Sequence, residues 1–240
     1  MELTFSPIGT ISSCYKEKFG IPRQAGLVPE ARATLELLAP FNRAEAVQGL
    51  EAFSHIWLVF VFHQNLRSTW KATVRPPRLG GNQRLGVFAT RSPFRPNSIG
   101  LSAVQLERLE VSGSRVVLHL KGVDLLDGTP VLDIKPYLPY ADCITDATGG
   151  FAAEPPGRNL EVFFTNRSRE TVLALEKAGY PHLQKLIIET LRGDPRPAYY
   201  KQQPQKSDFG CRILDFDVRW QFREGRIIVS ELVNQISRPI

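Results

Sequence analysis

The sequence predicts a mainly β protein, with an all-β sandwich or barrel over residues 1 to about 140 and a smaller α+β unit after it. Short apolar or alternating segments, separated by glycine and proline turns, fill the first part and leave little room for helix. Residues 141–159 then change to Asp, Thr, Gly, Ala and Pro, which is typical of a linker. We therefore expect two domains, at residues 1–145 and 155–240.

In the first part, strands are expected wherever β-branched and aromatic residues lie between turn signals: 4–12, 34–39, 53–64, 84–90, 99–109, 114–122 and 131–134. The run 53–64 is apolar on both faces, so we expect it to be buried from both sides. Asn42 and Glu45 have the spacing of a capping box, which predicts a helix that Gly49 ends. The dipeptide Asp127-Gly128 predicts a hairpin turn.

In the second part, a strand is expected at 160–165. Ser168 is then expected to cap a helix that runs to Lys177. Pro181 opens a second helix, and Gly193 ends it. Strands at 211–222 and 226–232 close the chain around a Glu224-Gly225 turn.

Composition limits the class of partner. The chain has 240 residues, a net charge of +6 and a pI near 9.4, which favours nucleic acid as the anionic partner. No apolar run is long enough for a membrane span, and the amino terminus has no signal-peptide pattern, so we expect a cytoplasmic protein without a membrane partner. Cys14, Cys143 and Cys211 are odd in number and far apart, which predicts reduced thiols and no metal site.

A cationic stretch dominates the middle of the chain. No acidic residue occurs between Glu51 and Glu107, yet seven cations do: Arg67, Lys71, Arg75, Arg78, Arg84, Arg91 and Arg95. Arginine pairs two oxygens at once and stacks on flat rings, which suits a phosphate-bearing or nucleobase ligand. A basic surface kept for solubility is the alternative. The interleaved glycines, prolines and phenylalanines favour a shaped site.

Polar groups also follow stiff or buried segments. Pro22-Arg23-Gln24 lies in a long loop, and His63-Gln64 ends a buried strand, where a ligand has access. The alternatives are a solvated loop and a structural histidine, and we expect His55 beside Ser54 to be structural. Two prolines fix the turn 91–97 and so preorganise its arginines. A dinucleotide fold is excluded, since no G-x-G-x-x-G follows a strand.

Five segments resemble the TsaA-like family, in particular its bacterial TrmO branch: 15–24, 49–55, 75–81, 89–97 and 127–137 with Asp127-Gly128-Thr129-Pro130 and Asp133-Ile134-Lys135-Pro136-Tyr137. The resemblance covers nearly the whole chain. It implies a single-sheeted β-barrel that binds S-adenosylmethionine without a Rossmann fold. It also implies methyl transfer to N6 of threonylcarbamoyladenosine at position 37 of tRNA, and a homodimer with cofactor sites near the subunit interface.

The resemblance assigns cofactor contacts to residues at strand exits and restrained turns: Pro22, Arg23, Gln24, His63, Gln64, Arg91, Leu101, Asp127, Gly128, Thr129 and Pro130. Arg91 suits the cofactor carboxylate, and Asp127 suits its ribose hydroxyls or ammonium. Leu101 offers apolar contact only, and plain core is the alternative for it.

The candidate general bases are Asp133, Tyr137 and His63, and a salt bridge or a structural hydroxyl is the alternative for each. The expected tRNA contacts are Arg67, Lys71, Arg75, Arg78, Arg84, Arg95, Asn97, Lys135 and Arg196, with Arg192 and Lys201 as further basic residues of the second domain. Phe94, Tyr137 or Tyr140 is expected to stack on the modified base. For Arg196 a rigid corner around residues 194–197 is the alternative. A non-catalytic RNA-binding module and a small-molecule methyltransferase remain as other functions.

Overall fold

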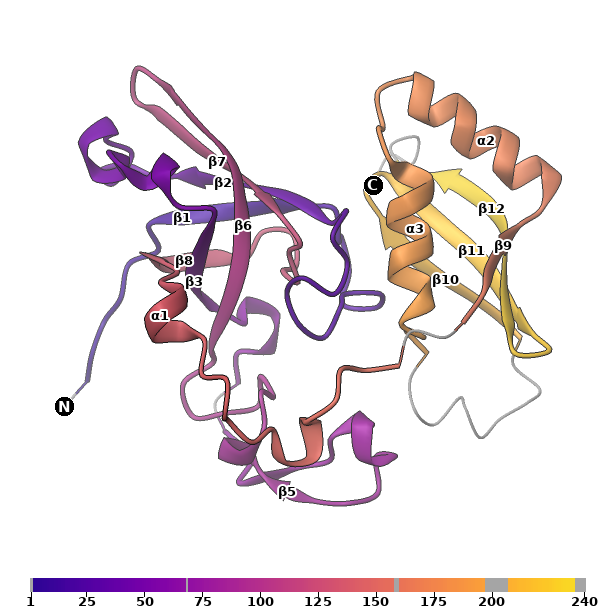
Figure 1. Ribbon diagram of the computed structural model, residues 1–240, viewed down its shortest axis with the longest axis horizontal. Helices are drawn as coiled ribbons and strands as arrows, with labels where there is room; N and C mark the ends of the chain where they lie inside the picture. The colour runs from indigo at the N-terminus through magenta and orange to yellow at the C-terminus, as the bar shows by residue number, and fades with distance from the viewer. Residues whose placement is uncertain (1, 68, 158–159, 197–206, 236–240) are drawn as a thin grey trace.

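The first part of the chain is a closed barrel, as the computed structural model shows over the residues that it describes: 2–67, 69–157, 160–196 and 207–235 (Figure 1). Six strands close it in the order β1-β2-β7-β6-β3-β8. Their bounds are β1 Gly9–Ser13, β2 Arg32–Leu37, β3 His55–Val61, β6 Ile99–Ser112, β7 Arg115–Lys121 and β8 Pro130–Pro136. The predicted mainly β class is confirmed, and of the two predicted architectures, sandwich and barrel, the structure has the barrel.

The barrel core comes from alternate residues of each strand. In β3 the side chains of Ile56, Leu58 and Phe60 point inward and are at most 5% exposed. Trp57 and Val59 lie on the outer wall and are only partly buried. The prediction that this strand is buried on both faces is therefore wrong, because a barrel has one interior and the described residues leave this outer wall only partly covered.

Residues 66–97, here called the basic lobe, leave the barrel between β3 and β6 and project from it (Figure 1). The lobe holds a two-stranded ladder of β4 (Thr73–Val74) and β5 (Leu85–Gly86) and two 3₁₀ turns, Pro77–Leu79 and Val87–Ala89. The strand predicted at 84–90 is thus shorter than expected. The chain turns after Gly86 because the Val87 N–H donates to Ala72 O at 2.9 Å and the Thr90 N–H donates to Val87 O at 3.1 Å.

The helix predicted after Asn42 is replaced by two 3₁₀ turns, Ala44–Val47 and Leu50–Ala52. The Asn42 amide donates to Ser114 O at 2.5 Å, so it does not cap the first turn. Tertiary contact has overridden the local capping pattern here.

The turn at Asp127-Gly128 exists, since Gly128 has a φ of 75°. It does not form a hairpin, because β7 pairs with β2 and β6 whereas β8 pairs with β1 and β3. The segment between β7 and β8 crosses one end of the barrel and places the turn beside β1.

After α1 (Pro139–Asp142) and a 3₁₀ turn at Gly150–Ala152, the second part forms a four-stranded sheet in the order β10-β11-β12-β9. Its elements are β9 Val162–Phe164, α2 Asn166–Lys177, α3 Leu183–Arg192, β10 Asp208–Ile213, β11 Phe216–Arg223 and β12 Arg226–Asn234. Thr165, and not Ser168, caps α2 by accepting from the Ser168 N–H at 3.2 Å. The strand predicted at 211–222 is two strands, with a turn at Leu214 (φ 52°).

The helix α3 and the end of β10 join this α+β unit to the barrel. Tyr15 is fully buried, pairs with Ile213 as an isolated bridge, and has its hydroxyl 3.4 Å from Thr190 Oγ1 of α3. The Leu214 N–H donates to Cys14 O at 2.7 Å. The apolar core is consequently continuous between the barrel and the second unit.

Candidate functional site

One end of the barrel gathers polar segments that are distant in sequence. His63 and Gln64 follow β3, and Asp127 and Gly128 precede β8. Lys18 Nζ donates to Gln64 O at 2.8 Å, which ties the loop after β1 to the exit of β3. A Cβ added at Gly128 would lie 4.0 Å from His63 Nε2. The predicted cofactor residues of these segments therefore lie side by side.

Asp127 is held firmly at this end. Its Oδ1 accepts from the Ser13 N–H at 2.8 Å and lies 2.9 Å from Lys16 Nζ. The turn is pinned to β1 as well, because the Gly128 N–H donates to Ile11 O at 2.8 Å. Thr129 is 3% exposed and its hydroxyl donates to Leu126 O, so this side chain braces the turn. The side chain of Asp127 keeps 36% of its surface exposed, which leaves it within reach of a ligand.

The pKa of His63 is lowered, first by partial removal of the ring from water and then by the nearby charge of Lys18. A hydrogen bond to the Val61 backbone opposes these two effects. The imidazole is therefore neutral at neutral pH and has one ring nitrogen available as a proton acceptor.

Arg91 joins the long loop to the basic lobe. Its Nη1 donates to Gln24 Oε1, so the segment Pro22-Arg23-Gln24 and Arg91 lie together. Arg95 has a different role, because its Nη1 donates to Thr90 O at 3.1 Å and to Ser92 O at 3.2 Å. The guanidinium of Arg95 thus fixes the turn that carries Arg91.

Asp124 is a residue of this site that the sequence reasoning missed. Its Oδ1 accepts from Ser102 Oγ at 2.7 Å, and its carboxylate also bonds to the backbone of Ala25. Burial raises its pKa to about 6, and these hydrogen bonds and the charge of Arg91 oppose that rise. The sequence did contain a signal for it, because burying an aspartate within the apolar run 123–126 costs free energy, and such a residue is often functional.

Asp133 and Tyr137 do not reach this end of the barrel in one chain. Asp133 pairs with Lys135 at 2.9 Å, and Tyr137 packs against Trp57 with ring centroids 5.7 Å apart. β8 has 7 residues, and at about 3.3 Å per residue Tyr137 lies roughly 20 Å from the Asp127 turn. The three predicted general bases are therefore not brought together within the protomer.

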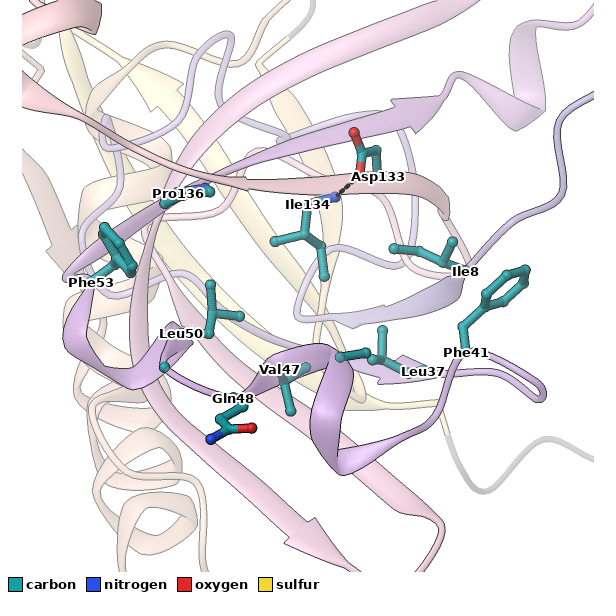
Figure 2. A pocket seen from close by; sticks show the side chains of 12 residues that line it. Ile8, Leu37, Phe41, Val47, Gln48, Leu50, Phe53, Asp133, Ile134 and Pro136 are labelled. Atoms are coloured by element: carbon teal, nitrogen blue, oxygen red, sulfur yellow. Dashed lines mark hydrogen bonds between the residues drawn. The ribbon is translucent and has the colours of Figure 1, made fainter.

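Asp133 lines a pocket of ≈ 550 Å³ at the opposite end of the barrel (Figure 2). Ile8 precedes β1 and Phe53 precedes β3, whereas Ser13 is the last residue of β1 and His63 follows the other end of β3. The wall is mostly apolar, with Leu37, Val47, Leu50 and Ile134 pointing into it. This pocket is separate from the polar end that carries His63.

Leu101 is 54% exposed on the outer wall of β6, so the plain-core alternative is wrong for this residue. It pairs across the sheet with Val59 of β3. Its neighbour Ser102 points inward and bonds Asp124, so β6 contributes to the polar end through Ser102. His55 bonds Ser54 Oγ at 2.9 Å, in agreement with a structural role.

The described cations of the basic lobe are not held in ion pairs. Within the described ranges, none of the seven has an ion pair, and Arg67 and Lys71 instead lie over the Phe94 ring at 4.8 and 5.5 Å from its centroid. Arg75, Arg78, Arg84 and Asn97 are exposed. This surface therefore carries exposed positive charge that is available to anions.

Arg196 is buried, unlike the predicted tRNA contacts of the basic lobe. It is 8% exposed, its Nε lies 2.7 Å from Asp194 Oδ1, and its guanidinium lies 3.3 Å from the centroid of the Phe222 ring. A buried, paired guanidinium is not presented to RNA, so the structure favours the rigid-corner alternative. Lys201 lies outside the described residues.

In the part of the chain that the structure describes, no helix combines the length and the apolar character needed to cross a membrane. Over the same residues, no three His, Cys, Asp or Glu side chains gather closely enough to hold a metal ion.

Comparison with known proteins links both parts of the chain to one family. The model described as "tRNA-methyltransferase O N-terminal domain" matches residues 10–143, and that described as "TrmO C-terminal domain" matches residues 157–235. A tRNA (adenine(37)-N6)-methyltransferase of Escherichia coli is 52% identical over 95% of this chain and 97% of its own length. A putative S-adenosylmethionine-dependent methyltransferase of Pseudomonas aeruginosa is 51% identical over 95% and 96%. The crystal structure of TrmO from Pseudomonas aeruginosa has a TM-score of 0.81 at 43% identity, covering 98% of this chain and 99% of that one.

Proposed function

The chain belongs to the tRNA-methyltransferase O family and is an S-adenosylmethionine-dependent tRNA (adenine37-N6)-methyltransferase, and we propose that its substrate is adenosine 37 already carrying a threonylcarbamoyl group. The observation that carries this proposal is the convergence of His63, Asp127 and Arg91, through their neighbours, at one end of the barrel. A carbamoyl group on N6 makes its proton easier to lose, so a weak base is sufficient.

The residues at the polar end fit the chemical groups of the cofactor. When bound, S-adenosylmethionine supplies an electrophilic methyl group. Arg91 would pair with its carboxylate, and Asp127 would accept from its ribose hydroxyls or its ammonium. Gly128 leaves space beside His63 that a side chain would fill, with a backbone at φ 75° that disfavours other residues. Pro22, Arg23, Gln24, Gln64, Leu101, Thr129 and Pro130 complete the proposed cofactor contacts.

We propose His63 as the general base that the protomer itself provides. Its lowered pKa keeps the ring neutral, and its bond to the Val61 backbone fixes the ring while the other nitrogen accepts the N6 proton. Asp133 and Tyr137 remain proposed catalytic residues only if a second copy of the chain brings them to this end.

Asp124 is proposed as a positioning residue. It contacts the backbone of Ala25, next to Gln24, and the side chain of Ser102, next to Leu101. One carboxylate thus joins two of the segments that bind the cofactor in this proposal, and the charge of Arg91 acts on it as well. Keeping the ionised carboxylate of Asp124 partly buried costs folding free energy. This cost supports a functional reason for an aspartate at this position.

A homodimer is also part of this proposal. Ile99 and Leu101 are 38% and 54% exposed on the outer wall of β6, next to the partly buried Val59 and Val61 of β3. Burying such a wall against a second copy would be favourable. Leu101→Arg is expected to give a monomer in sedimentation experiments, and an unchanged mass would contradict this interface.

We also propose a cytoplasmic location for the protein and a division of the chain into domains at residues 1–145 and 155–240.

The test of the substrate compares two tRNA preparations that differ only in the threonylcarbamoyl group on adenosine 37. Transfer of labelled methyl from S-adenosylmethionine is expected only to the tRNA that carries the group. Equal transfer to both would contradict the proposed substrate. Equilibrium dialysis with labelled cofactor, without tRNA, would separate loss of cofactor binding from loss of substrate recognition.

A further inference from the structure

The basic lobe displays two large aromatic rings to solvent. Trp70 and Phe88 are 51% and 72% exposed, and their rings stack with centroids 6.2 Å apart and planes 24° apart. Single exposed apolar residues are common, but a stacked pair of exposed rings costs hydrophobic free energy that burial of either would recover. The exposed pair of rings is therefore suited to bind a ligand with a flat face.

The lobe's own backbone holds these rings outward. Val87, next to Phe88, is 1% exposed and its N–H donates to Ala72 O at 2.9 Å. The ladder pairs Thr73 with Gly86, so the chain after Trp70 and the chain before Phe88 run side by side. Val87 is buried, whereas Phe88, the next residue of the 3₁₀ turn, points to solvent.

The electrostatic surroundings indicate which flat ligand fits. Arg75, Arg78 and Arg84 of the same lobe are exposed, and the sequence has no acidic residue from 52 to 106. Exposed aromatic rings within a cationic surface are the arrangement by which proteins bind unpaired nucleobases, since the rings stack on bases while the cations contact phosphates.

Phe94, which the sequence suggested for stacking, is less suitable. Arg67 and Lys71 already lie over its ring, and the residue is partly buried. Trp70 and Phe88 offer more exposed ring surface than Phe94 within the same lobe.

We propose that Trp70 and Phe88 form a stacking platform for an unpaired base of the substrate tRNA, separate from the base that receives the methyl group. This inference rests on the proposed function, because it takes tRNA as the substrate. It adds a binding site for a second nucleotide, and so predicts that the lobe reads the single-stranded part of the RNA.

The test measures the affinity of an anticodon stem-loop RNA for the full chain across a series of salt concentrations. Trp70→Ala and Phe88→Ala are each expected to lower affinity by about 5- to 150-fold at every salt concentration, without changing the slope of the logarithmic salt plot. Trp70→Phe is expected to retain most of the affinity, because it keeps a ring. Phe5→Ala is the matched control, since Phe5 is 61% exposed and lies outside the lobe.

Two further measurements separate this inference from the proposed function. Cofactor affinity measured without tRNA should be unchanged in Trp70→Ala, and the KM for tRNA should rise, whereas failure of the wild-type chain to prefer the threonylcarbamoyl tRNA would contradict the proposed substrate alone. The platform is overturned if Trp70→Ala and Phe88→Ala bind the stem-loop as tightly as the wild type does. It is also overturned if the two substitutions weaken binding of a blunt RNA duplex, which has no unpaired base, as much as binding of the stem-loop. A change in the oligomeric state of the variants that accounts for the lost affinity would overturn it as well.

Discussion

The arginines of the basic lobe differ from four arginines of the α+β unit, Arg167, Arg196, Arg219 and Arg226, which are held in ion pairs. In the unit, Arg196 pairs with Asp194, Arg219 with Asp217 and Glu231, and Arg226 with Glu161. In the lobe, no arginine within the described residues has a carboxylate within ion-pair distance, and the local sequence contains none. An arginine already paired with a carboxylate gains little from a phosphate. The difference supports our proposal that the lobe binds RNA, whereas the paired arginines of the unit hold structure.

The largest expected effect comes from removing lobe charges. Changing Arg75, Arg78 and Arg84 together to alanine should lower tRNA affinity about 100-fold near physiological salt and reduce the salt slope by about 2 to 3, because each loses a phosphate contact. The matched control changes Arg167, Arg219 and Arg226 to alanine in the unit. An equal loss in the control, measured in the same binding titration, would abolish the contrast between the two regions.

The next effect concerns stability. Arg196→Ala should lower the free energy of unfolding by about 2 kcal/mol, because it leaves Asp194 without this partner and uncovers the Phe222 ring. Arg226→Ala, which breaks an exposed pair, should cost less than about 1 kcal/mol. Urea titrations measure both. If Arg196→Ala instead weakened tRNA binding at full stability, Arg196 would be an RNA contact after all.

Charge at the junction between barrel and unit gives a pH-dependent effect. Glu30 is 6% exposed and lies 2.6 Å from Lys185 of α3 and 2.8 Å from Arg32. The bond to Lys185, assisted by Arg32, lowers its pKa from 4.5 to about 2. A lowered pKa stabilises the fold above pH 4.5, and this contribution is lost as pH falls from 4.5 toward 2.

Glu30→Gln should therefore reduce unfolding free energy at neutral pH by on the order of 2 kcal/mol, with the difference from wild type closing as pH falls through that window. Thermal unfolding followed against pH measures this. A constant difference down to the acid limit would indicate lost packing and not lost charge.

The smallest expected effect concerns Asp124, whose pKa is influenced by the charge of a lobe arginine, Arg91, outside ion-pair distance. Asp124→Asn should weaken cofactor binding about 10-fold at pH 7 and remove the decline that wild type shows as pH falls through about 6, where Asp124 is protonated. A raised pKa also means that the folded wild type binds more protons than the unfolded chain between pH 3.8 and about 6. Wild-type stability should therefore fall with rising pH there relative to the variant. A change in stability with an unaltered pH profile of binding would reduce Asp124 to a structural residue.

Much of the fold was predictable because strand patterns are local. The segments that became β6, β7 and β8 alternate or repeat apolar residues and end at glycine or proline. The errors occurred where a distant partner competes with a local pattern. Asn42 bonds Ser114 instead of capping a helix, and β7 and β8 pair with other strands instead of with each other.

The sequence by itself determined the surplus of arginine between residues 51 and 107, the turn at Gly128 and the polar exit at His63-Gln64, because charge, backbone freedom and burial pattern are properties of neighbouring residues. Only the tertiary structure decided that Asp127 meets Ser13, 114 positions away, that Asp124 holds the loop near Gln24, and that Asp133 lines the apolar pocket and not the site with His63. Closure of a barrel sets these distances through long-range strand pairing, and such pairing leaves no mark in the local sequence.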